Sequence, residues 1–308
     1  MNIALLANPT AGKGRLAGLV PAVEERLRAH GAAVVRLTGR TAADMLDDAH
    51  RAVRDGVRAL VAMGGDGTVH LGLQAVGGTG VPFGIVPAGT GNDFAVRLGL
   101  AGDPLAAAGD IADALRDGET RAIDLARVVG ADGTEAWFGA VLAAGFDAFV
   151  NERANRMRWP RGAQRYNRAI VEELLALRPR RYRMSLDGAP TDFDSVLVAV
   201  GNTESYGGGF RIAPGADPTD GLLDVVVADP IGRLKLMRLR PKVFTGAHVL
   251  DPCVSTYRAR TVDLSAEGVT AYADGERICP LPLKITCVPG ALSVITKASR
   301  TREYQEPS

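Results

Sequence analysis

The sequence lacks the features that mark secreted, disulfide-rich or membrane-spanning proteins. It has only three cysteines, Cys253, Cys279 and Cys287, and no C-x-x-C pair, which argues against a disulfide framework or a zinc site. No apolar stretch reaches the roughly 18 residues of a membrane span. The segment MNIALLANPT has neither the basic start nor the long apolar run of a signal peptide. We therefore expect a soluble, cytoplasmic protein.

A surplus of charge is also absent. Lys and Arg total 36 against 35 Asp and Glu, so the net charge is +1 and the pI about 7.8. The chain as a whole therefore creates no field that would attract nucleic acid or a membrane. Lysine is scarce, so almost every basic residue is an arginine. Contact with an anionic surface must come from local arginine clusters.

The first 125 residues alternate between strand and helix patterns. NIALLAN and VRALVAMGG read as buried strands, and TAADMLDDAHRAVRDG reads as a helix. Thr41 is suited to the N-cap of this helix, Asp44 to its first turn and Gly56 to its end. This alternation predicts an α/β domain with a parallel sheet wrapped by helices.

The pattern changes near residue 122 to short apolar runs separated by turn residues, such as DFDSVLVAVGN, LKITCVPG and LSVIT. These runs predict a mainly antiparallel β-sandwich domain, interrupted by helices around 163–177 and 231–245. A length of 308 residues also favours two domains. We place the first domain at 1–124, the second at 125–292 and a tail at 293–308, for which a return to the first domain stays open.

Three glycine-rich loops follow the first, third and fourth predicted strands: NPTAGKGR (8–15), GGDGT (64–68) and PAGTGNDFA (87–95). The carboxyl ends of parallel strands line the ligand crevice, and each loop precedes a helix whose N-terminal N–H groups favour an anion. Three glycines in one short turn indicate either a positive φ or a close approach of the backbone to a neighbour. One such loop is more often a simple turn, but three at one sheet edge favour a phosphate site.

Two known phosphate motifs are weighed against the first loop. GKGR lacks the upstream glycine and the following Ser or Thr of a P-loop. GKGRLA formally fits a dinucleotide-binding pattern, but three residues separate it from the strand and no acidic residue ends the strand AAVVRLT. Neither motif explains the loop.

The motifs NPTAGKG, GGDGT, PAGTGNDFA and ADGE (273–276) occur in this order along the chain. IDLARV (123–128), AAGFDAFV (143–150) and GGGFRIAPGADPTDGLLDVVV (207–227) lie between them. On these motifs the sequence resembles the diacylglycerol kinase catalytic-domain family, and in particular the small soluble bacterial lipid kinases. The resemblance implies a nucleotide-binding first domain, a lipid-substrate second domain, and ATP and Mg²⁺ as cofactors.

The implied reaction is phosphorylation of a membrane lipid hydroxyl, with diacylglycerol as the favoured substrate. A sphingoid base, phosphatidylglycerol and phosphoinositide stay open as alternatives. NAD kinases share GGDGT but do not resemble NPTAGKG, and a non-enzymatic nucleotide sensor would not need the full set of carboxylates. His70-Leu71 replaces the Asn-Glu that follows GGDGT in many bacterial members, and we expect His70 at the helix surface.

The resemblance also implies site residues. Those for ATP are Asn8, Lys13, Thr38, Gly64, Gly65, Gly67, Thr68, Gly89, Thr90 and Asn92. The carboxylates expected to gather between the two domains, for Mg²⁺ and the incoming hydroxyl, are Asp66, Asp124, Asp274 and Glu276. We assign Asp274 as general base, with Asp66 as its rival, although Asp274-Gly275 alone is also typical of a hairpin turn. A separate structural Mg²⁺ is implied at the side chain of Asp220 and the backbone carbonyls of Asp217 and Leu222.

Two segments concentrate arginine. Residues 151–183 carry ten arginines with Trp159, Tyr166 and Tyr182 among them, and GRLKLMRLRPKVF (232–244) is a second basic run. Cations with interleaved aromatic or apolar residues predict peripheral contact with an anionic membrane surface, where the lipid substrate lies. Nucleic acid is the alternative that we do not favour, and a solvated helix face would explain any single arginine. A homodimer stays open.

Overall fold

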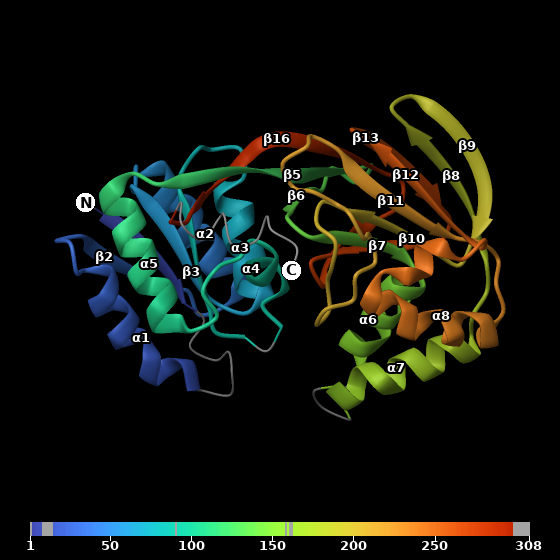
Figure 1. The fold of residues 1–308 in the computed structure, drawn as a ribbon, viewed down its shortest axis with the longest axis horizontal. Coiled ribbons are helices and arrows are strands. Elements are labelled where there is room, and N and C mark those ends of the chain that lie inside the picture. The colour runs from blue at the N-terminus through green and yellow to red at the C-terminus, as the bar shows by residue number, and fades with distance from the viewer. Residues whose placement is uncertain (1, 8–14, 90, 158, 160–162, 298–308) are drawn as a thin grey trace. The chain divides into compact units, whose positions relative to one another are not determined.

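A computed structural model describes residues 2–7, 15–89, 91–157, 159 and 163–297 (Figure 1). The chain divides into two compact units, Met1–Leu125 with Val288–Ser308, and Ala126–Cys287. The chain therefore crosses between the units twice, once within β5 (Thr120–Gly130) and once within β16 (Leu283–Ile295).

The first unit is an α/β structure. Its elements before β5 are β1 (Asn2–Ala7), α1 (Arg15–Leu27), β2 (Ala33–Leu37), α2 (Ala42–Arg54), β3 (Ala59–Gly64), α3 (Asp66–Val76), β4 (Phe83–Pro87), α4 (Asp93–Arg97) and α5 (Pro104–Asp117). Strands β2-β1-β3-β4 pair in parallel in this order, as the alternation of patterns predicts.

Burial on both faces explains why the inner strands of this sheet read as unbroken apolar runs. On one face Leu5 and Val61 pack with Val23 of α1 and Ile111 of α5. On the other face α3 approaches β4 so closely that a Cβ at Gly72 would lie 2.5 Å from the Phe83 ring.

Helix α2 shows that local signals in the sequence determine its start. Thr41 is the N-cap, its hydroxyl accepts the Asp44 N–H at 3.1 Å, and the Asp44 carboxylate accepts the Thr41 N–H at 3.0 Å. This reciprocal pair is a capping box, and it confirms the predicted roles of Thr41 and Asp44.

The second unit is an antiparallel β-sandwich with helices. Its elements after β5 are β6 (Glu135–Phe138), β7 (Val141–Gly145), α6 (Phe146–Arg156), α7 (Ala163–Leu175), β8 (Arg180–Leu186), β9 (Ala189–Ser195), β10 (Leu197–Gly201), β11 (Leu223–Ala228), α8 (Arg233–Thr245), the short 3-10 helix η2 (Ala247–Leu250), β12 (Val254–Ala259), β13 (Thr261–Ala266), β14 (Thr270–Ala273) and β15 (Glu276–Pro280). One sheet has the order β12-β11-β10-β7-β14-β15, and the other contains β13, β8 and β9 beside the start of β16. Phe138, Leu142, Val225, Leu264 and Ile285 belong to the core that these two sheets share.

Two parts of the second half differ from the sequence prediction. LKITCVPG and LSVIT form one continuous strand, β16, in which Gly290 adopts φ +63. Leu283 to Thr286 pair with β13, and Val294 pairs with Phe83 of β4. Helix α6 was not expected, because AAGFDAFV continues the apolar run of β7; Gly145 at φ +139 turns the chain from strand to helix. None of the helices in the described part of the chain is both long and apolar enough to cross a bilayer.

Candidate active site

The GGDGT turn joins β3 directly to α3. Gly64 ends β3, Gly65 is the N-cap, and Asp66 and Gly67 are the first residues of the helix. Thr68 is buried and its N–H donates to the Gly65 carbonyl at 2.9 Å. The N–H groups at the start of a helix point out of its N-terminal end, and the helix dipole favours an anion near them.

Close approach, not positive φ, explains the glycines of this turn. Gly65 has φ −93, in the extended region. A Cβ at Gly64 would lie 2.3 Å from the Thr68 Oγ1, and a Cβ at Gly89 would lie 2.4 Å from the Gly65 Cα. The turns after β3 and β4 therefore touch backbone to backbone, which only glycine permits.

Asn92 fastens the two turns together. Its Oδ1 accepts the Gly89 N–H at 2.9 Å and its Nδ2 donates to the Gly89 carbonyl at 3.1 Å. Its own N–H donates to the Asp66 Oδ2 at 3.0 Å, and its φ of +57 is a conformation that asparagine tolerates better than most residues. Asp66 is thus held at the edge of the sheet where the two turns meet.

Of the other residues predicted to bind the nucleotide, the structure describes Thr38 but not Asn8, Lys13 or Thr90. Thr38 is exposed directly after β2, at the same carboxyl edge of the parallel sheet. Asn8, Lys13 and Thr90 lie outside the described residues.

Asp124 lies on β5 in the first unit and is 4% exposed. Its Oδ1 accepts the N–H of Gly290 at 2.8 Å, so that it links β5 to β16. A buried carboxylate must be compensated, and this hydrogen bond supplies part of the compensation.

Asp274 and Glu276 flank the hairpin turn between β14 and β15. Asp274 (φ +52) and Gly275 (φ +85) form the two-residue turn, and Glu276 is the exposed first residue of β15. The carboxylate of Asp274 accepts two backbone N–H groups of the β6–β7 connection, Gly139 at 3.0 Å and Ala140 at 2.9 Å. Asp274 is therefore both a hairpin residue and a rigidly oriented carboxylate.

The structure thus brings together Gly64, Gly65, Asp66, Thr68, Gly89 and Asn92 within the first unit, and Asp274 with Glu276 within the second. The gathering of Asp66 and Asp124 with Asp274 and Glu276 stays a prediction.

The loop predicted to hold a structural Mg²⁺ contains oxygen donors but also an arginine. The Asp220 carboxylate accepts the Leu222 N–H at 3.0 Å and pairs with Arg258. The Asp217 carboxylate accepts the Thr219 N–H at 3.0 Å and lies in the same loop. No group of three His, Cys, Asp or Glu side chains suited to a metal occurs among the described residues. The predicted ligand set is of another kind, with one side chain and two backbone carbonyls.

Asp224 is a neighbour of this loop that the sequence did not single out. Its Oδ2 is buried without a hydrogen-bond partner, and burial raises the pKa of the carboxyl, with further raising effects from Asp220 and Asp217. Arg258 acts in the opposite direction. The loop and its neighbour Asp224 thus carry three carboxylates against the one arginine. Mg²⁺ prefers oxygen ligands, so the residues present fit the ion.

Two further residues were misjudged or missed. His70 is 7% exposed within α3, beside the Gln74 Nε2 at 3.3 Å, so the expectation that it lies at the helix surface is wrong. Gly72, two residues further along α3, faces Phe83 of β4, so His70 is buried on a different side of the helix, beside Gln74. Asp147 accepts a hydrogen bond from the Tyr206 hydroxyl, and burial raises the pKa of both groups. This pair fastens α6 to the loop that contains three successive glycines with positive φ, residues 207–209.

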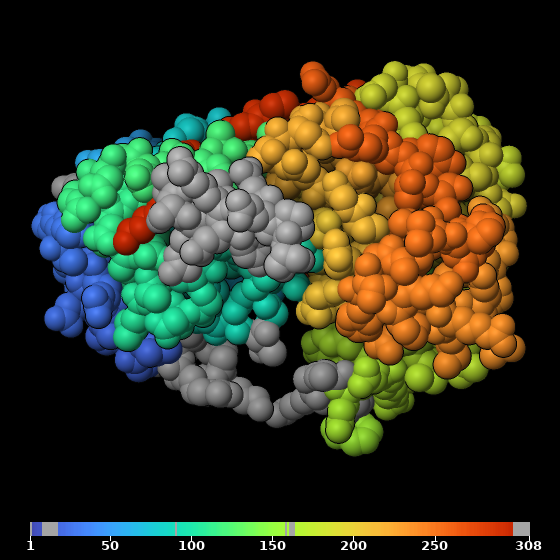
Figure 2. Space-filling view, in the orientation of Figure 1, coloured from blue at the N-terminus to red at the C-terminus, as the bar shows by residue number. Residues whose placement is uncertain are grey.

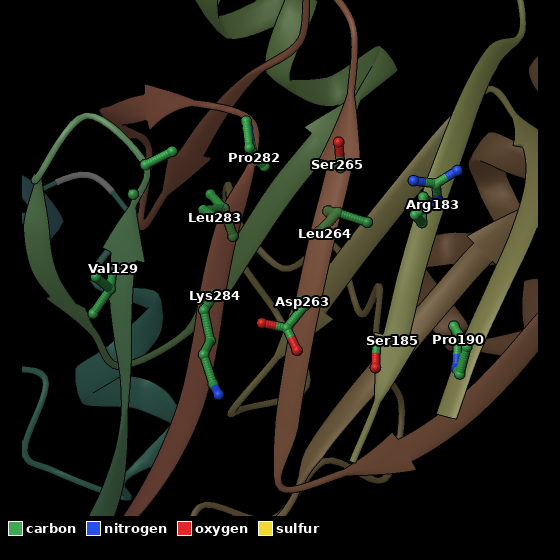
Figure 3. A pocket seen from close by; sticks show the side chains of 12 residues that line it. Val129, Arg183, Ser185, Pro190, Asp263, Leu264, Ser265, Pro282, Leu283 and Lys284 are labelled. Carbon is green, nitrogen blue, oxygen red and sulfur yellow. The ribbon is translucent and has the colours of Figure 1, made fainter. Parts of the chain in front are cut away.

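A hollow of about 350 Å³ on the face of the β16–β13–β8 sheet is lined by none of the predicted site residues (Figure 3). Lys284, Asp263 and Ser185 lie opposite one another on the three strands, and the hollow is open to solvent. It gives no reason to move the candidate site away from the glycine turns.

Comparison with known proteins agrees with this division. A model of the diacylglycerol kinase catalytic domain matches residues 2–128, and a model of the YegS C-terminal NAD kinase beta sandwich-like domain matches residues 140–296. The chain is 46% identical over 294 residues to a diacylglycerol kinase of Mycobacterium tuberculosis, covering 95% of this chain and 94% of that protein.

Solved structures share the fold. A diacylglycerol kinase from Bacillus anthracis superimposes with a TM-score of 0.70 at 20% identity, covering 97% of each chain. An NAD kinase from Archaeoglobus fulgidus, solved with ATP, gives a TM-score of 0.57 at 15% identity, covering 98% of this chain and 96% of that one.

The parallel α/β unit with closely packed glycine turns and the antiparallel sandwich are a fold that this chain shares with the solved diacylglycerol kinase and NAD kinase structures. With both family models matched in order and a relative 46% identical along nearly its whole length, the chain belongs to the diacylglycerol kinase catalytic-domain family. It is a lipid kinase, and this membership implies the use of ATP.

Proposed function

We propose that the chain transfers the γ-phosphate of ATP to the free hydroxyl of diacylglycerol, giving phosphatidic acid. The observation that supports this most is the pair of glycine turns held together by Asn92, with Asp66 fastened beside them. A relative named diacylglycerol kinase at 46% identity supports the choice of lipid.

The first unit would bind the nucleotide. The N–H groups at the start of α3 suit the phosphates, and the absence of side chains at Gly64, Gly65 and Gly89 lets the turns come close to them. Asn8, Lys13, Thr38, Gly67, Thr68, Thr90 and Asn92 are proposed to complete this site. Asp66 and Asp124 are proposed to hold Mg²⁺, which offsets the phosphate charge when bound.

Asp274 is proposed as the general base. Two backbone N–H groups fix its carboxylate, so that it needs no reorientation to accept the proton of the lipid hydroxyl. The hydroxyl oxygen then forms a bond to the γ-phosphorus, the bond from that phosphorus to the bridging oxygen breaks, and ADP leaves with the electron pair. Glu276, two residues away, is proposed to assist at the same place.

The lipid must be reached at a membrane. Segments 151–183 and 232–244 are proposed to supply peripheral contact with the bilayer.

A structural Mg²⁺ is proposed to stabilise the loop before β11, with Asp217, Asp220 and Leu222 as its ligands. Asp224 extends this loop's donor set with an unpaired buried oxygen.

The test is transfer of labelled γ-phosphate from Mg-ATP to mixed micelles of diacylglycerol, sphingosine, phosphatidylglycerol or phosphatidylinositol, with NAD assayed in parallel. Label in diacylglycerol, lost in Asp66→Ala, is the expected result. Label confined to another lipid would replace the substrate and keep the reaction, whereas label only in NAD would overturn the lipid assignment.

A further inference from the structure

Helix α8 presents an apolar face to solvent. Leu234, Met237, Pro241 and Phe244 recur at intervals of three or four residues, which places them on one side of the helix. Leu234 is 74% exposed and Met237 56% exposed. Single exposed apolar residues need no explanation, but a continuous stripe on one helix indicates a binding surface.

Cations border this stripe on both sides. Arg233 and Arg240, seven residues apart, lie along one flank, and Lys235 and Lys242 lie along the other. Both lysines form ion pairs with the Asp251 carboxylate, Lys235 at 2.7 Å and Lys242 at 3.4 Å.

No acidic residue occurs in the helix itself. Within the described part of the chain, the three arginines Arg233, Arg238 and Arg240 form no ion pair. Figure 2 shows the atoms of α8, in orange, at the surface that faces the viewer.

A hollow of about 680 Å³ lies beside the first turn of α8. Leu177, Pro179 and Ile231 supply apolar lining, while Arg233 and Arg238 supply guanidinium groups. A guanidinium is the planar donor that suits a phosphate oxygen pair, and apolar lining suits the glycerol and first methylenes of a lipid.

The other arginine-rich segment is different, because much of its charge is neutralised internally. Arg153 pairs with Glu172 at 3.1 Å and also with Glu173. Arg168 pairs with Glu172 at 2.7 Å, and Arg183 pairs with Asp192 at 3.2 Å. Paired arginines attract an anionic surface less strongly than unpaired ones.

We propose that α8 docks on an anionic bilayer, with its apolar stripe inserted among the lipids and the phosphate of one anionic phospholipid held in the hollow between Arg233 and Arg238. The docking proposal rests on the proposed function, because an enzyme whose substrate is a membrane lipid must reach the bilayer. Nucleic acid fits less well, because the most exposed residues of the stripe, Leu234 and Met237, have no ring on which a base can stack, and the ring of Phe244 already packs against Phe210.

The experiment is sedimentation of the full chain with vesicles of phosphatidylcholine alone and of phosphatidylcholine with phosphatidylglycerol, without ATP. We expect binding that needs phosphatidylglycerol and weakens with salt. The variant Leu234→Ser/Met237→Ser should bind at least about tenfold more weakly, since each side chain loses apolar area removed from water. Arg238→Gln should bind about fivefold more weakly.

Two variants are matched controls. Val35→Ser/Val129→Ser removes side chains that are 54% and 39% exposed on β2 and β5, and Arg54→Gln removes an exposed charge from α2. Both should bind vesicles within about twofold of the unmodified chain. Circular dichroism melting of every variant checks that each one is folded.

Undiminished binding of Leu234→Ser/Met237→Ser, or an equal loss in the controls, would overturn the proposal. So would absence of vesicle binding together with binding of a single-stranded RNA oligonucleotide. Because no ATP is present, failure here leaves the kinase assignment untouched. Conversely, docking through α8 by a chain that phosphorylates no diacylglycerol would refute the proposed substrate and keep the surface.

Discussion

The second unit contains two hairpin turns that share the dipeptide Asp-Gly and have similar, positive φ angles at both residues. Asp187-Gly188 joins β8 to β9 with φ values of +49 and +90, and Asp274-Gly275 joins β14 to β15 with +52 and +85. Each aspartate accepts hydrogen bonds from two consecutive backbone N–H groups: Arg260 and Thr261 for Asp187, and Gly139 and Ala140 for Asp274.

The likeness shows that local geometry explains the Asp-Gly pair at both turns. Two residues with positive φ form the hairpin turn that asparagine or aspartate followed by glycine favours. Asp187 is exposed and Asp274 is partly buried. The chemical role proposed for Asp274 therefore rests on its family motif, and Asp187 is its natural control.

The largest difference between the two turns should be in catalysis. Asp274→Asn keeps the shape of the side chain and its fit to a positive φ but removes the base, so turnover should fall about 10²- to 10⁴-fold. Asp187→Asn should leave turnover within about twofold. Steady-state assays of labelled phosphate transfer check both, and an equal loss in the two variants would mean that Asp274 acts only through the fold.

The glycine turns after β3 and β4 extend the comparison to the first unit, where close packing of Gly65 and Gly89, and not a positive φ, explains the glycines. Gly89→Ala should destabilise this unit by about 1–3 kcal/mol, because its Cβ would meet the Gly65 backbone. Gly109→Ala, in α5 with nothing near its Cβ, should instead stabilise it by up to about 1 kcal/mol. Urea unfolding measures both, and a harmless Gly89→Ala would contradict the close packing of the turns.

The glycines of the two hairpins should respond alike. Gly275→Ala and Gly188→Ala place a Cβ on residues with positive φ, and each should cost about 1–2 kcal/mol although no atom lies within 4 Å of either Cβ. Asn in place of each glycine should cost less, because asparagine tolerates this region. Thermal melting ranks the stabilities of the Ala and Asn variants. If Gly275→Asn lost turnover without losing stability, catalysis would need glycine at this turn for a reason other than folding.

The smallest effect concerns acid stability. Hydrogen bonds from the N–H groups of Thr261 and Arg260 lower the pKa of Asp187 below its usual value. The charged form of this side chain is therefore more stable in the native state than in the unfolded chain. Its stabilisation is present above the unfolded pKa and is lost as the pH falls through the native one. The stability gap between the unmodified chain and Asp187→Asn should therefore shrink as the pH is lowered below about 4. A gap that is constant with pH would contradict this.

Local signals made the main elements of both units predictable. The strand–helix alternation gave the parallel sheet, Thr41 and Asp44 gave the start of α2, and the apolar runs gave the sandwich. Helices near 163–177 and 231–245 also correspond to α7 and α8.

What the sequence did not reveal depends on contacts between distant residues. The partners of Asp274 lie about 135 residues earlier in the chain, and the pairing of Asp147 with Tyr206 spans 59 residues. The Asn92 amide and the touching of Gly65 and Gly89 depend on the spacing of β3 and β4. Helix α6 was missed because its first residues continue an apolar strand pattern.

Equilibrium binding of Mg-ATP to Asp66→Asn and Asp274→Asn, measured beside their turnover, tests the division of roles most directly. The account predicts that Asp274→Asn binds ATP like the unmodified chain while turnover collapses, and that Asp66→Asn binds ATP about tenfold or more weakly. If Asp274→Asn turns over normally while Asp66→Asn loses turnover with ATP binding intact, the base is Asp66 and the account is wrong.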